Sequence, residues 1–166
     1  VLNVNGKHPY SSHFFQWPLD EKPMLYYWKK DSRLYLMGNP TIWFCGFLGV
    51  FMFFLIPLYK KNRKLNSPDF FRKPAILYLY LFSWLFYAGV SRTSFLYYYL
   101  TPLCFSIILF GLCFDFYTKG LSQKNKNIIF AALIVLCFLG FLFYLPFTYG
   151  IPLSEKAVSL RLLIPF

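Results

Sequence analysis

Four apolar runs, each 17 to 23 residues long, dominate the pattern of hydrophobic and polar positions along the chain. They lie at about 41–59, 74–90, 95–117 and 128–149. An α-helix rises 1.5 Å per residue, so about 20 apolar residues cross the hydrocarbon core of a bilayer. Helices at the surface of a soluble bundle would need a polar face, and these runs have none. We therefore predict an all-α membrane protein whose domain over 41–149 contains four transmembrane helices.

The composition supports a membrane protein. Of the 166 residues, 58% are hydrophobic and 24% aromatic, while only 14% are charged; a soluble domain has about 25% charged residues. The formal net charge of +11 would suggest nucleic acid as the partner of a soluble protein. Here the basic residues lie mainly between apolar runs, where they act as topology signals and lipid-headgroup contacts. We expect membrane lipid as a partner and no nucleic acid.

The distribution of Lys and Arg predicts the orientation of the helices. The segment 60–73 contains six basic residues and the segment 118–127 contains three. Because basic residues concentrate in cytoplasmic loops, both segments are predicted to be cytoplasmic. The segment 1–40, the turn at 91–94 and the tail at 150–166 are then extracytoplasmic.

The segment 1–40 differs from the membrane domain in composition. It combines Trp, Tyr, Phe and Pro with scattered charges, which suits a position at the membrane surface. We expect a short interfacial helix from Pro23 to Leu36. The sequence Gly38-Asn39-Pro40 should end this helix and turn the chain into the first membrane helix.

Few side chains suggest metal binding or acid–base chemistry. The cysteines lie in apolar runs without a C-x-x-C pair, and His8 and His13 lack the companions that a zinc site needs, so no metal site is expected. Asp20 and its neighbours form a short charged sequence that we interpret as a solvated turn. Asp115 and Lys119 are four residues apart and are expected to form an ion pair at a helix end.

Three motifs then stand out in order along the chain. They are SSHFFQWPL at 11–19, GNPTIW at 38–43 and SRTSFLYYYL at 91–100. Their order and spacing resemble the segments around the last membrane helices of protein O-mannosyltransferases. Phe14, Lys22, Phe44 and Tyr98 depart from that pattern, since the family usually has Trp, Arg, Trp and His at these places.

The resemblance implies a function. The chain would be the C-terminal membrane module of a multi-span glycosyltransferase of the GT-C type, a mannosyltransferase. This enzyme class transfers mannose from polyprenyl-phosphate mannose, its lipid-linked donor, to Ser or Thr of secreted proteins. The family's catalytic carboxylate lies in the first extracytoplasmic loop, outside this sequence. We therefore expect both ends of the chain to continue in a longer protein, no catalytic residue here, and no activity of this fragment alone.

Arg92 is the leading candidate for binding the lipid phosphate. It lies in a short turn between two apolar runs, and a guanidinium can bind phosphate through two parallel hydrogen bonds. Lys22 is a second candidate cation, and Trp17, Tyr98 and Tyr99 are candidates for shaping the lipid or acceptor surface. The alternatives are an Arg that only anchors a helix end and an aromatic belt at the membrane interface.

Two other functions fit the sequence less well. One is a non-enzymatic membrane protein, such as a transporter subunit or an assembly factor. The other is a related glycosyltransferase that uses a lipid-linked sugar on another acceptor. The richness in Lys and Asn favours a bacterial inner membrane over an endoplasmic reticulum. The acceptor proteins, the polyprenol, metal dependence and pairing with a homologue stay open.

Overall fold

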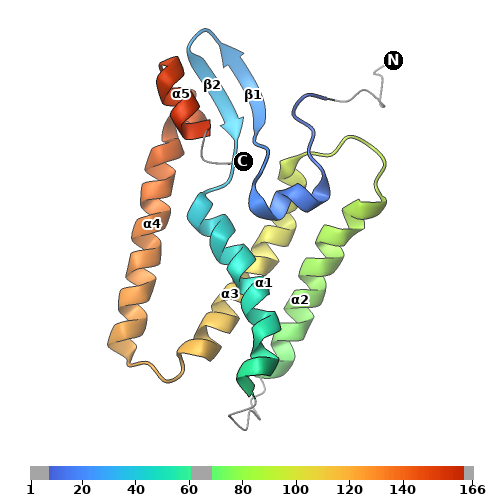
Figure 1. Cartoon of the computed structure of the whole chain (residues 1–166), viewed down its shortest axis with the longest axis vertical. Helices are drawn as coiled ribbons and strands as arrows, with labels where there is room; N and C mark the ends of the chain where they lie inside the picture. Colours follow the sequence, from blue (N-terminus) through green and yellow to red (C-terminus); the bar gives the residue numbers. More distant parts are fainter. Residues whose placement is uncertain (1–7, 61–68, 163–166) are drawn as a thin grey trace.

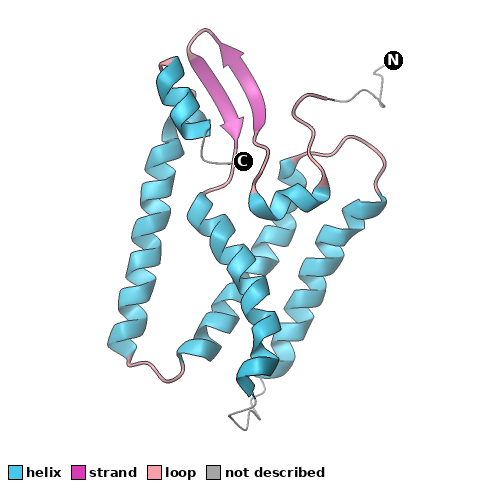
Figure 2. Cartoon of the chain, in the orientation of Figure 1, coloured by secondary structure: helices cyan, strands magenta, loops and turns pink. Residues whose placement is uncertain are grey.

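The computed structural model describes residues 8–60 and 69–162 of the chain. Within these residues the fold is mainly helical, with one small sheet that stands at one end of the helices, next to α5 (Figures 1 and 2). In chain order the elements are η1 (Phe14–Leu19), β1 (Met24–Lys29), β2 (Ser32–Leu36), α1 (Pro40–Lys60), α2 (Asp69–Leu85), η2 (Phe86–Gly89), η3 (Leu96–Tyr99), α3 (Leu100–Thr118), α4 (Gln123–Tyr149) and α5 (Glu155–Leu162).

The helices α1 to α4, together with the short 3-10 helices η2 and η3, cover nearly all of the four apolar runs, which confirms the helical fold. Two continuous helical stretches, Leu96–Thr118 and Gln123–Tyr149, are long and apolar enough to cross a membrane. The apolar stretches Pro40–Ile56 and Pro74–Gly89 are helical but shorter. The presence of four complete spans therefore stays a prediction.

The predicted interfacial helix at Pro23–Leu36 is wrong, because this segment forms an antiparallel hairpin of β1 and β2. Tyr26, Tyr27 and Trp28 make up half of β1, and β2 contains Tyr35; aromatic side chains favour extended backbone. Two residues connect the strands, and the first, Lys30, has a left-handed φ of 51°, as tight hairpin turns require. A bulge between Leu25 and Tyr27 interrupts the register of β1.

The tail after Tyr149 folds against this hairpin. Leu153 N–H donates to the Asp31 carbonyl over 3.1 Å, and Arg33 forms an ion pair with Glu155 at the start of α5. The Tyr35 ring also meets Phe147 of α4 edge to face, with centroids 5.1 Å apart. The hairpin, α5 and the end of α4 thus form one packed unit.

Two glycines allow α1 to approach α3 closely. A Cβ on Gly46 would lie 2.5 Å from Ser106 Oγ, and a Cβ on Gly49 would lie 2.6 Å from the backbone of Phe110. Small residues commonly allow such approach between membrane helices. The Ser106 side chain opposite Gly46 can move, whereas the Phe110 backbone opposite Gly49 cannot. The close approach of α1 and α3 therefore depends more strictly on Gly49 than on Gly46.

The connecting segments gather at the two ends of the helices. The coil before η1, the hairpin, the loop between α2 and α3, and α5 lie at one end, and the loop between α3 and α4 lies at the other (Figure 1). We call the first of these the hairpin end. At the opposite end Asp115 pairs with Lys126 over 3.8 Å, so the expected pairing with Lys119 is wrong. Lys126 comes from the start of α4, which meets the end of α3 where the rings of Phe114 and Phe130 lie 4.7 Å apart.

Replacing Gly49 by Ala should destabilise the protein by about 1–3 kcal/mol, because the added methyl forces α1 away from the α3 backbone. The matched control is Gly111→Ala on α3, where an added Cβ meets no heavy atom within 4 Å. The measurement is the thermal unfolding midpoint of the full-length protein in detergent. Equal midpoints for the two variants would show that the close approach is not needed.

Candidate functional site

A cavity of about 800 Å³ opens at the hairpin end. It is lined by residues of the segment 8–16, by Lys22, and by residues of the segment 87–94. The first segment precedes and enters η1, and the last contains the end of η2 and the loop to η3. Two segments that are far apart in sequence, 8–16 and 87–94, therefore line the same cavity.

Trp17 of η1 holds these walls together. Its side chain is completely buried, and its Nε1–H donates to Ser12 Oγ over 2.8 Å. Its ring meets Tyr87 edge to face at 5.2 Å and lies 6.2 Å from the ring of Tyr98. Its carbonyl accepts a hydrogen bond of 2.8 Å from Trp43 Nε1–H of α1. One residue thus joins the coil, α1 and both segments that flank the loop.

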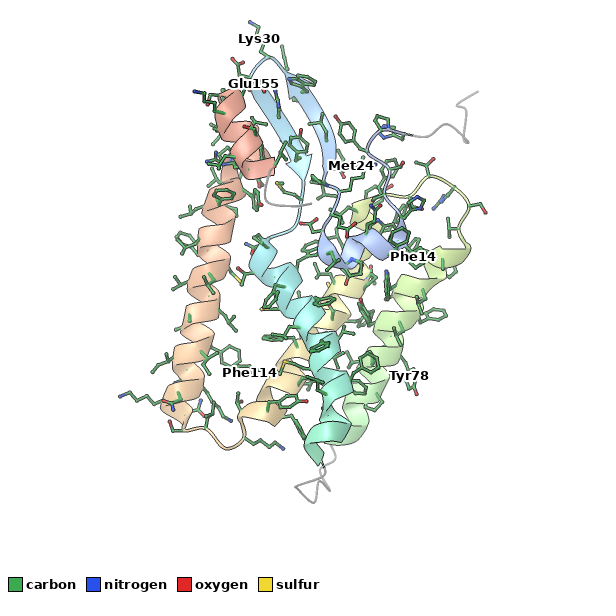
Figure 3. All side chains as sticks on the ribbon, viewed as in Figure 1. Phe14, Met24, Lys30, Tyr78, Phe114 and Glu155 are labelled. Carbon is green, nitrogen blue, oxygen red and sulfur yellow. The ribbon has the colours of Figure 1, made fainter. Side chains whose placement is uncertain are left out.

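Further contacts connect the coil to α2 and to the loop. Ser12 N–H donates to the Ser94 carbonyl over 2.9 Å. Trp84 Nε1–H of α2 donates to the Phe14 carbonyl over 2.8 Å, and the two rings lie 6.0 Å apart. Figure 3 shows Phe14 beside the upper part of α2. These bonds hold η1 across the end of α2, where it closes the inner side of the cavity.

Arg92 and Lys22 both line the cavity, so the structure brings the two candidate cations together. The Arg92 guanidinium donates to the Tyr98 hydroxyl over 3.3 Å and lies 5.7 Å from the centroid of that ring. Arg92 is exposed and Lys22 is half-buried. Among the described residues, neither has a carboxylate within ion-pair distance.

The aromatic candidates occupy different positions. Trp17 and Tyr98 lie behind the cavity and support it through the contacts given above. Tyr99 is 1% exposed and its hydroxyl lies 3.1 Å from that of Tyr80, so it belongs to the helix core.

The cavity also contains two basic side chains that we did not select from the sequence. His8 and His13 line it together with Arg92 and Lys22, and none of the residues described as lining it is Asp or Glu. The cluster of His8, His13, Lys22 and Arg92 could not be predicted from the sequence, because Arg92 lies far from the other three along the chain and only the fold brings them to one cavity. Such an arrangement can bind an anion, but its lining offers no carboxylate base. Within residues 8–60 and 69–162, no three His, Cys, Asp or Glu side chains group as metal ligands.

Comparison with known families gives a direct match. The family model described as the C-terminal four TMM region of protein-O-mannosyltransferase matches residues 2–165. The chain belongs to this family. It is therefore part of a multi-pass membrane protein, as the apolar runs predict.

Individual relatives of the chain are also named as protein mannosyltransferases. The chain is 27% identical to dolichyl-phosphate-mannose–protein mannosyltransferase 1 of Schizosaccharomyces pombe, over 90% of this chain and 18% of that protein. It is also 27% identical to protein O-mannosyl-transferase 1 of Homo sapiens, over 79% of this chain and 19% of that protein. The chain thus spans about a fifth of the length of these relatives.

A solved structure has the same fold. The match is to the Saccharomyces cerevisiae protein O-mannosyltransferase Pmt1-Pmt2 complex bound to the sugar donor, with a TM-score of 0.79 and 19% identity. It covers 96% of this chain and 24% of the solved chain. The overall fold of this chain has therefore already been seen in a solved structure.

The Gly38-Asn39-Pro40 motif has a clear structural role at the start of α1. Asn39 Oδ1 accepts from the N–H of Thr41 at 3.1 Å and caps α1, with Pro40 at the first helical position. The Asn39 amide also donates to the Cys137 carbonyl of α4 over 2.8 Å. A Cβ on Gly38 would lie 2.3 Å from the Trp43 ring, so only glycine fits there.

Asp20 is not in a solvated turn, which corrects the prediction from the sequence. It is 3% exposed, and its Oδ2 accepts from Gly38 N–H over 2.7 Å. Its Oδ1 has no hydrogen-bond partner among the described residues. Burial raises the pKa of Asp20 to about 7, although the bond from Gly38 acts in the opposite direction.

This raised pKa makes stability depend on pH. Between pH 3.8 and about 7 the folded protein holds a proton on Asp20 that the unfolded chain has released. The free energy of unfolding should therefore fall as the pH rises through this window, by at most about 4 kcal/mol, and this contribution should level off above it. Asp20→Asn keeps an acceptor for Gly38 and should remove the dependence.

The measurement is the unfolding midpoint of the full-length protein between pH 4.5 and 8, for the wild type and Asp20→Asn. Asp31→Asn, at an exposed carboxylate of the hairpin turn, is the control and should keep the wild-type slope. Parallel curves for the wild type and Asp20→Asn would contradict a protonated Asp20 in the folded state.

Proposed function

We propose that the chain is the C-terminal membrane module of a protein O-mannosyltransferase that transfers mannose from polyprenyl-phosphate mannose to Ser or Thr of secreted proteins. The observation that carries the proposal is the cavity at the hairpin end, which Arg92 and Lys22 both line and whose described lining contains no carboxylate. The names of the relatives support the reaction. The non-enzymatic alternative gains no such support.

In this proposal the cavity binds the phosphate of the lipid donor. The isoprenoid tail must stay in the bilayer, so its phosphate has to lie at the headgroup level, close to the ends of the membrane helices. Arg92 is fixed at such an end, and its guanidinium is held by Tyr98. As mannose leaves, negative charge grows on the phosphate, and a cation placed there stabilises that charge more than it stabilises the bound donor.

The division of roles within the enzyme follows from the lining of the cavity. The described lining offers cations and hydroxyls but no carboxylate that could take the proton of the acceptor. We propose that this base comes from a part of the protein outside the chain, as the family resemblance implies. This module would then hold the donor and be inactive when isolated.

We also propose that α1 to α4 each cross the membrane, with the hairpin end extracytoplasmic. The two shorter apolar helices can span when the bilayer thins locally or flanking side chains extend to the interface. Lys119 in the loop between α3 and α4 and Lys124 in the first turn of α4 lie at the opposite end, which fits the cytoplasm.

The comparisons bear on the partner and on the compartment of the protein. Association with a second, homologous chain is proposed from the solved complex of two mannosyltransferases. The bacterial inner membrane stays a prediction from Lys and Asn content, and the relatives compared above, from yeasts and human, do not support it.

Changing Arg92 to Ala in the full-length protein should lower kcat/KM for the lipid donor roughly tenfold to a hundredfold, because a charge-assisted hydrogen-bonded pair is lost. Arg92→Lys should recover only part, since it keeps the charge and loses the planar fork. The measurement is mannosyl transfer to a Ser/Thr peptide, normalised to folded protein.

The control for loss of a positive charge is Lys119→Ala at the opposite end of the helices, which should keep wild-type transfer. Full recovery by Arg92→Lys, together with reduced expression of Arg92→Ala, would show an anchoring residue. Wild-type turnover in Arg92→Ala would remove Arg92 from the site.

The orientation can be tested with single cysteines at exposed serines. A cysteine at Ser91 or Ser154 should react with a membrane-impermeant thiol reagent from the extracytoplasmic side, and a cysteine at Ser122 only after permeabilisation. Ser12 is unsuitable because it is buried against Trp17, and Ser67 lies outside the described residues. Labelling of Ser122 from outside in intact cells would reverse the proposed topology.

A further inference from the structure

The outward face of α2 and η2 carries a continuous set of large apolar side chains. Tyr78, Phe82 and Phe86 follow one another at intervals of four residues and are 70%, 75% and 64% exposed. Residues four apart lie on the same side of a helix, one above the next. With the exposed Leu79 and Leu85 beside them, they form what we call the α2 stripe.

The stripe faces away from the other helices. The opposite side of α2 is packed inward, where Leu77 and Tyr80 are buried and Trp84 donates a hydrogen bond to the first residue of η1, Phe14. Figure 3 shows Tyr78 projecting outward from α2. Within the described residues, neither the hydrogen bonds nor the core clusters attach another element to Tyr78, Phe82 or Phe86.

The stripe leads directly to the cavity. Its last member, Phe86, precedes Tyr87, and the Tyr87 side chain lines the cavity while its ring packs against Trp17. Ala88 and Val90 continue the same lining up to Arg92. A ligand whose charged group lay at Arg92 would therefore find apolar aromatic surface immediately below it, along α2.

We propose that the α2 stripe binds the isoprenoid tail of the polyprenyl-phosphate donor whose phosphate lies between Arg92 and Lys22. This inference rests on the proposed function and adds the position of the tail. The order of charged and apolar surface argues for this occupant, since a cationic cavity followed by the apolar α2 stripe matches a phosphate followed by a hydrocarbon chain. The exposed face of α4 is equally apolar, but it leads to the hairpin and α5 rather than to the cationic cavity.

The tail contact should affect binding and not the chemical step. The tail is in contact with the stripe before, during and after transfer of mannose, so its contribution is the same in the ground state and the transition state. Loss of one aromatic ring from the stripe should raise KM about threefold to tenfold and leave kcat unchanged. A donor too short to reach the ring should be insensitive to its loss.

The first experiment compares Phe82→Ala with the matched control Phe138→Ala, an exposed phenylalanine of α4. Both variants of the full-length protein are assayed with a long-chain polyprenyl-phosphate mannose and with mannosyl phosphate bearing one isoprenoid unit. Phe82→Ala should raise KM for the long donor alone, and Phe138→Ala should change neither. An equal effect on both donors, no effect on the long donor, or the same effect in the control would overturn the proposal.

The second experiment does not require mannose transfer. A photoreactive p-benzoylphenylalanine is placed at position 82 or 138, and the protein is irradiated with polyprenyl phosphate in nanodiscs. Position 82 should cross-link to the polyprenyl chain and position 138 should not, beyond the level seen with excess phospholipid. Cross-linking of position 82 only to phospholipid or to other parts of the protein would overturn the tail site. An inactive protein that still gives the specific cross-link would instead contradict the proposed transferase function.

Discussion

The indole of Trp17 is completely buried where the N-terminal coil, α1, η2 and η3 meet, and every polar group that it brings there is bonded. A buried N–H without an acceptor would cost on the order of 1–3 kcal/mol. Ser12 supplies that acceptor, and Trp43 of α1 supplies the donor for the Trp17 carbonyl. Because the rings of Tyr87 and Tyr98 pack around the same indole, the positions of the coil, of the end of α2 and of the start of α3 depend on one residue.

That constraint determines where the charges of the module lie. Lys22 follows η1, and Arg92 lies in the loop that Ser12 bonds to through Ser94. Placing either cation in the hydrocarbon core would raise the free energy of the folded protein, whereas a cation at the end of a membrane helix stays hydrated. With no described carboxylate opposite them, they are available to an external anion, and the apolar α2 stripe begins beside them. An amphiphilic ligand fits this arrangement better than a soluble one.

The helices could be predicted because lipid-facing helices need only a long run of apolar residues, and that property is local. The β-hairpin could not be predicted with the same rule, since the residues from Pro23 to Leu36 have no regular period and their conformation depends on α4 and α5. The position of Asp20 depends in the same way on Gly38, which follows the hairpin. Within the site, motif order selected Arg92, which lines the cavity, and Trp17, which packs behind it, whereas Tyr99 belongs to the core. The two histidines became visible only when the fold joined their segment to the loop.

The central claim is that a lipid phosphate binds between Arg92 and Lys22, and a structure with bound ligand tests it most directly. The measurement is a cryo-EM reconstruction of the full-length protein with a non-reacting phosphonate analogue of polyprenyl-phosphate mannose. We expect phosphonate oxygens within about 3 Å of the Arg92 guanidinium nitrogens and the tail alongside Phe82. A phosphonate bound elsewhere, with the Arg92 and Lys22 side chains in contact only with water, would contradict the claim.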